Sequence, residues 1–240
     1  MTSAHFKGFP AEGLQFLKQL KRNNNREWFI AHKATYEDSV KKPMQELVEI
    51  LAVEFAKFAP DIHASARGSL YWINRDTRFS KDKSPYKTHV AAVFPPKGLG
   101  KHGGAGFYFH IAPGEVFVGG GLYMPLPEDL KAVRETIAAD PRRFEAILKK
   151  QGFRRMFSEM TGEQLARVPR GFAATHPAAD YLRFKQFLAA RTLPSDSATF
   201  PAFAGTLVET FKTLHPFIHF LNEPILAGRR SRERQESLLS

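Results

Sequence analysis

The chain has 240 residues, of which 43% are hydrophobic and 22 are Phe, so it is long and apolar enough to form a packed globular core. It contains no Cys, which excludes disulfides, thiolate metal sites and cysteine nucleophiles. The formal net charge of +11 favours anionic partners, either small anions or nucleic acid, and it is equally consistent with Lys and Arg on solvated helix faces that keep the protein soluble.

The first sixty residues predict three helices. Apolar residues recur with helical spacing from Leu14 to Leu20, and the pattern stops at Asn23. Asn25 is in a position to cap a second helix, and Pro43 is in a position to begin a third.

The period of the pattern changes between about residues 68 and 124. Segments rich in β-branched and aromatic residues, bounded by Gly and Pro, predict four mostly antiparallel strands there, the first within residues 68–79. Two of the strands, about 105–112 and 115–123, are expected to join at the turn "PG".

Helical patterns return after the strands. One helix is expected from Pro127, a second from Pro141 with Asp140 as its cap, and two further amphipathic helices within 178–190 and 202–226. The order of helices, strands and helices predicts an α+β fold, in which a mostly antiparallel central sheet (about residues 68–124) is covered by the N- and C-terminal helices. We expect one domain over residues 1–226.

Residues 227–240 are polar and charged, as in a disordered tail. The chain also lacks an apolar leader and any apolar run long enough to span a bilayer. We therefore expect a cytoplasmic protein without a membrane partner. The sequence specifies neither a cofactor nor an oligomeric state.

The densest run of charged residues lies between residues 71 and 90. A run of Arg and Lys between two predicted strands is typical of a site for an anion, because Arg offers a planar fork of donors and Lys a point charge. This predicts a pocket for a phosphate-bearing or other anionic small ligand. The predicted ligand-binding residues are Arg75, Arg78, Lys83 and Lys87. The catalytic candidates are Asp76, as general base or orienting carboxylate, and Tyr86, as a hydrogen-bonding wall.

Two other interpretations fit the same segment. In the first, the motif is a scaffold in a protein-interaction domain, and Asp76 and Asp82 form an internal network of salt bridges with its basic residues. Alternatively, Trp72, Phe79 and Tyr86 would be stacking surfaces of a non-enzymatic nucleic-acid-binding module.

A possible metal site lies further along the chain. His215, His219 and Glu223 have the spacing i, i+4, i+8 and would share one helix face, as metal ligands do. Pro216, however, stands where the zinc-protease pattern has Glu. Since His on a helix face is more often solvated or hydrogen-bonded in the core, we predict no metal ligand.

The charged segment resembles the bacterial domain-of-unknown-function family numbered 2461. The residues that carry the resemblance are Arg75, Asp76, Arg78, Phe79, Asp82, Lys83 and Tyr86. Where the family pattern opens with an Arg, this chain has Trp72. The flanking stretches "NNNREWF", "SPYKT" and "GGGLYMP" extend the resemblance to about residues 9–225. The resemblance implies that the motif matters, and it implies no reaction, cofactor or substrate, because the family has no established activity.

Overall fold

The computed structural model describes residues 6–101 and 103–239. The chain forms two compact units, each made of several segments. Unit 1 comprises residues 1–94, 108–118 and 191–210, and unit 2 comprises residues 95–107, 119–190 and 211–240. Each unit thus holds part of the sheet and part of the last helix. The expectation of one domain over residues 1–226 stays a prediction.

The N-terminal helices follow the predicted caps. The side chain of Asn25 accepts a hydrogen bond from Trp28 N at 2.9 Å, and Pro43 lies in the first turn of the third long helix. A π-helical turn that the sequence did not predict comes directly before that helix. The elements are α1 (Ala11–Arg22), α2 (Arg26–Ala31), α3 (Lys33–Tyr36), η1 (Glu37–Lys41), α4 (Lys42–Phe58) and α5 (Ala66–Ser69).

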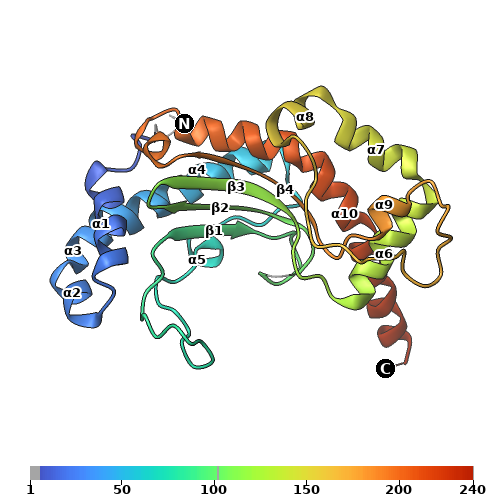
Figure 1. The fold of residues 1–240 in the computed structure, drawn as a ribbon, viewed down its shortest axis with the longest axis horizontal. Coiled ribbons are helices and arrows are strands. Elements are labelled where there is room, and N and C mark those ends of the chain that lie inside the picture. Colours follow the sequence, from blue (N-terminus) through green and yellow to red (C-terminus); the bar gives the residue numbers. More distant parts are fainter. Residues whose placement is uncertain (1–5, 102, 240) are drawn as a thin grey trace. The chain divides into compact units, whose positions relative to one another are not determined.

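Four antiparallel strands form one sheet in the order β1-β2-β3-β4, which confirms the α+β fold class. Figure 1 shows the strands side by side, with the segment between α5 and β1 leaving the sheet as a long loop. The strands are β1 (Val90–Phe94), β2 (Gly106–Ala112), β3 (Glu115–Leu122) and β4 (Phe187–Pro194).

The fourth strand is not the one that the sequence predicts. Residues 68 and 69 belong to α5, and residues 70–79 form no regular strand but only isolated bridges, Leu70 with Ala92 and Asn74 with Tyr86. The fourth strand is β4, which begins in a stretch predicted as an amphipathic helix. Its burial alternates at first, as in a strand with one buried face.

One face of the sheet is packed with Phe. On β2, Phe107 and Phe109 are fully buried, whereas Tyr108 and His110 alternate with them and point to the opposite face. The last helix, α10 (Phe203–Leu239), covers the buried face, where the rings of Phe107 and Phe211 stack at 4.8 Å within unit 2. Helix α6 (Pro127–Ala139) also packs against the sheet.

The three consecutive Gly residues of β3 allow a close approach of its neighbours. A Cβ on Gly121, which has φ +135°, would lie 1.9 Å from Phe187 O of β4. A Cβ on Gly120 would lie 2.9 Å from the side chain of Leu214 on α10. Strand and helix packing therefore explain these glycines.

The remaining helices complete the two units. Asp140 caps α7 by accepting a hydrogen bond from Arg143 N at 3.0 Å, as predicted. Helix α10 continues to Leu239, through the segment for which the sequence indicates a disordered tail. Within the described part of the chain, no helix is both long and apolar enough to cross a bilayer. The other elements are α7 (Pro141–Lys149), α8 (Gln151–Phe157), α9 (Ala179–Leu182) and η2 (Ser195–Thr199).

Candidate functional site

The charged segment is an irregular hairpin, residues 70–89, between α5 and β1 of unit 1. Its two arms are paired by hydrogen bonds from Arg75 N to Pro85 O (2.9 Å) and from Lys87 N to Ile73 O (2.7 Å). We call residues 70–76 and 84–89 the base of the hairpin and residues 77–83 its tip. The base is anchored in the unit by Ile73 and Tyr86, which are both buried.

Tyr86 is held from two sides by the N-terminal helices. Its ring stacks on Phe29 of α2, with centroids 4.1 Å apart and planes at 17°. The side chain of Asn24, in the turn between α1 and α2, accepts a hydrogen bond from Tyr86 N at 3.1 Å and donates one to Tyr86 O at 2.9 Å. The side-chain amide of Asn24 therefore forms hydrogen bonds with both the N–H and the C=O of Tyr86.

The base of the hairpin borders a depression of about 560 Å³ in unit 1. The end of α1 and the turn after it contribute Lys21 and Asn24 to the lining. The hairpin contributes Arg75, Asp76, Asp82, Ser84, Tyr86, Lys87, Thr88 and His89. Three cationic side chains and two carboxylates thus line one concave surface, and the balance is positive.

Of the predicted site residues, Arg75, Asp76, Tyr86 and Lys87 line this depression, and two do not. Arg78 instead forms a bidentate ion pair with the exposed carboxylate of Asp76, with Nε 3.0 Å from Oδ1 and Nη2 2.7 Å from Oδ2. Lys83 donates a hydrogen bond to Thr77 O at 2.9 Å within the tip.

Both acids of the motif are paired with arginines. Asp82 accepts a hydrogen bond from Arg75, which together with Ser84 holds the pKa of Asp82 well below its usual range. The hydrogen bonds from Arg78 likewise lower the pKa of Asp76. These pairs match the salt-bridge interpretation in part. They are solvent-exposed, however, and exposed pairs add little to stability.

Lys87 is a partly buried cation of the base. Its Nζ donates to Trp72 O at 2.6 Å and lies 5.4 Å from the centre of the Tyr71 ring. Burial lowers the pKa of Lys87. An ammonium has three protons to donate, so one hydrogen bond to Trp72 leaves donors for a ligand in the depression.

His89 is a titratable lining residue that sequence reasoning missed. Burial, followed by the neighbouring His110 and Lys87, lowers its pKa to about 4, so the imidazole is neutral at pH 7. Its ring lies 5.1 Å from that of His110. His110 is in turn 3.1 Å from the Tyr108 hydroxyl and 3.7 Å from the Glu115 carboxylate.

The aromatic residues proposed as stacking surfaces are divided between two environments. Trp72 and Phe79 are exposed at 80% and 96%, and the guanidinium of Arg78 lies 5.8 Å from the centre of the Phe79 ring. Tyr86 is buried and its face is occupied by Phe29, so it offers no free stacking surface.

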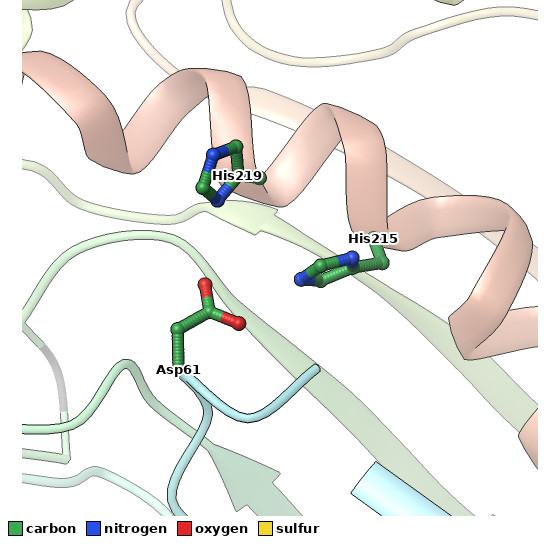
Figure 2. Close-up of side chains that lie close together, drawn as sticks. All are labelled: Asp61, His215 and His219. Atoms are coloured by element: carbon green, nitrogen blue, oxygen red, sulfur yellow. The ribbon is translucent and has the colours of Figure 1, made fainter. Parts of the chain in front are cut away.

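The histidines with helical spacing lie on α10, in unit 2. Figure 2 shows His215 and His219 on the same side of the helix, and their ring centroids are 5.9 Å apart. Figure 2 also draws Asp61, which belongs to unit 1. His219 Nε2 lies 3.5 Å from the Oε1 atom of Glu223, the third residue of the pattern.

The comparisons with known proteins identify a family without identifying an activity. A family model described as "Conserved hypothetical protein (DUF2461)" matches residues 12–220, which include the whole hairpin. A search of the curated proteins found no match.

Proposed function

Because the chain belongs to the DUF2461 family of conserved hypothetical proteins, whose description states no activity, we propose a function from the site itself. The depression at the base of the hairpin binds a phosphate-bearing or other anionic small molecule. The observation that carries this proposal is that Arg75 and Lys87 of the motif line the same concave surface as Lys21 of α1.

The cations differ in what they offer to an anion. Arg75 uses Nη1 for Asp82, which fixes the orientation of a guanidinium that has five N–H donors in all. Lys87 is partly desolvated, which strengthens its attraction for a charged ligand. Lys21 approaches from another element and is exposed, so it adds long-range attraction and little geometric selection.

The two catalytic candidates have different roles in this proposal. The pKa of Asp76 is lowered by Arg78, which makes its carboxylate a weak proton acceptor and suits it to orienting a ligand rather than to general-base catalysis. Tyr86 is a buried wall of the depression, fixed by Phe29 and Asn24. The imidazole of His89 is neutral at pH 7, and it would take up a proton if a bound anion raised its pKa.

The test is the melting temperature of the protein in inorganic phosphate, sulfate and AMP, each up to 10 mM at constant ionic strength. A ligand at ten times its Kd stabilises the native state by about 1.4 kcal/mol, which raises Tm by about 3 to 5 °C for a chain of this size. At least one of the three should produce such a shift.

A matched pair of variants tests whether the anion binds in the depression. Lys87→Met should abolish the shift, whereas Lys81→Met makes the same change of charge in the tip, outside the lining, and should retain it. No shift with any anion, or an equal loss in both variants, would contradict the proposed pocket.

Nucleic-acid binding is the second candidate, and the exposure of Trp72 and Phe79 favours it. Stacking on these rings should make single-stranded DNA or RNA bind at low salt, with an affinity that falls steeply as salt is added. The double variant Trp72→Ala, Phe79→Ala should then lose the binding. Retained binding in that variant, or none in the parent at low salt, would remove this candidate.

A further inference from the structure

We propose that His215 and His219 of α10 bind one divalent transition-metal ion of the zinc, nickel and cobalt class. Both histidines belong to unit 2, whereas the residues that line the anion-binding depression belong to unit 1. The proposal reverses the prediction made from the sequence, and the reason lies in how the helix accommodates Pro216.

Pro216 does not interrupt the helix. Proline lacks the N–H of a helical hydrogen bond and usually kinks or ends a helix, yet α10 extends from Phe203 to Leu239 with Pro216 inside it. The two histidines therefore keep helical spacing and share one face, one turn apart (Figure 2). Pro216 removes the general-base Glu of a zinc protease, but that Glu is not a metal ligand. The absence of protease chemistry is thus no argument against metal binding.

The distance between the two imidazoles suits a shared ion after a small adjustment. A ring nitrogen of His215 lies within 4.8 Å of a ring nitrogen of His219. Two imidazole nitrogens on one tetrahedral zinc ion lie about 3.4 Å apart, since each Zn–N bond is about 2.0–2.1 Å. The side chain of His219 is 56% exposed, and a small rotation of an exposed ring is enough to close the difference.

The same face of the helix supplies a supporting carboxylate. Glu223 Oε1 is 3.5 Å from His219 Nε2 and 2.5 Å from Nη2 of Arg143 on α7, so the carboxylate is held in place beside the imidazole. Metal-bound histidines usually have such a partner, which orients the ring and makes its nitrogen a better ligand. Imidazole ligands select zinc, nickel, cobalt or copper over magnesium and calcium. Two protein imidazoles leave further coordination positions open for oxygen ligands.

The test uses metal binding itself, on protein without a polyhistidine tag. Zn²⁺ and Ni²⁺ are titrated separately against a competing chromophoric chelator, and we expect one ion per chain. His219→Asn should weaken binding at least tenfold, and the double variant His215→Asn, His219→Asn should abolish it. Because His219 is exposed, its variant should keep the parent Tm in the absence of metal.

A control histidine and a spectrum separate this site from incidental binding. His63→Asn removes an exposed imidazole of unit 1 and should leave the metal affinity unchanged. X-ray absorption of the zinc-loaded parent should show two imidazole ligands, with oxygen donors in the other positions. A site with two histidine ligands should have a Kd below about 10⁻⁴ M. The proposal would be overturned if the parent binds no metal at about 100 µM free metal, or if the double variant binds metal as the parent does.

Discussion

The tip of the 70–89 hairpin is more densely charged than its base, and the two regions lie in very different environments. The tip carries Phe79, which is 96% exposed, and its residues Arg78, Asp82 and Lys83 form hydrogen bonds within the hairpin. The base carries Tyr86, which is 7% exposed, together with Lys87 and His89, two partly buried groups that also line the depression. The density of charge along a sequence therefore does not mark a pocket. Burial and contacts with distant elements do.

The largest expected difference between the two regions is in stability. Tyr86→Ala removes a buried ring stacked on Phe29 and should lower the free energy of unfolding by about 3–5 kcal/mol. Phe79→Ala removes a ring of the same size from the surface and should change it by no more than about 0.5 kcal/mol. Urea unfolding of both variants measures the difference. Similar losses in both would show that the tip is packed as firmly as the base.

The second difference is in the response to acid, through His89. The pKa of His89 is 6.5 in the unfolded chain and about 4 in the folded one. Between pH 6.5 and pH 4, the imidazole is therefore protonated in the unfolded chain but neutral in the folded chain. Stability should consequently fall as the pH falls from 6.5 to 4, and His89 should contribute nothing above this window. Since the ring is partly exposed, the loss is roughly 1–2 kcal/mol rather than the full value of the shift.

His89→Gln isolates this contribution. Unfolding free energies at pH 7 and pH 4.5 should differ less in His89→Gln than in the parent, whereas His63→Gln, which changes an exposed imidazole of the same unit, should behave as the parent does. Lys87 and His110, which face His89, are present in all three proteins. An unchanged pH dependence in His89→Gln would mean that this imidazole is solvated.

The smallest effect on stability is expected for Asp76→Asn. Asp76 and Arg78 form an exposed pair, so the variant should fold as the parent does in chemical denaturation. It should also bind phosphate more tightly, by about fivefold or less, because a carboxylate has been removed from the lining of an anion site. If Asp76→Asn unfolds the protein instead, the motif is a structural clamp and Asp76 does not belong to a binding site.

The parts of the fold that could be predicted are those with local causes. Capping by Asn25 and Asp140 depends on residues three positions away, and the turn between β2 and β3 depends on two residues. β4 was missed because the apolar residues of the stretch are also spaced as on an amphipathic helix, whereas pairing with β3 is a long-range contact. The same holds for residues 68–79, which are strand-like in composition but have only isolated bridges.

The residues of the candidate site also divide into those that have a local signal in the sequence and those that do not. Arg75 and Lys87 were predicted because the motif concentrates basic residues in a short segment. Lys21 and His89 were missed, since one is about fifty residues away in the sequence and the other is a single imidazole with no characteristic spacing. The one local signal for His89 was its place within a segment predicted as a strand, and the observed strand β1 begins one residue later, at Val90.

The two hydrogen bonds of Asn24 have a consequence for aggregation. In the bridge between Asn74 and Tyr86, the ladder bonds come from the neighbouring residues, so the N–H and C=O of Tyr86 point outward, as on the free edge of a sheet. A carboxamide has the donor and acceptor of a peptide group, and Asn24 therefore occupies this edge as one residue of an additional strand would. An unpaired edge is a template on which a second chain can add a strand. Asp at position 24 would lack the donor and place an oxygen against Tyr86 O, so deamidation of this one side chain would open the edge to intermolecular pairing.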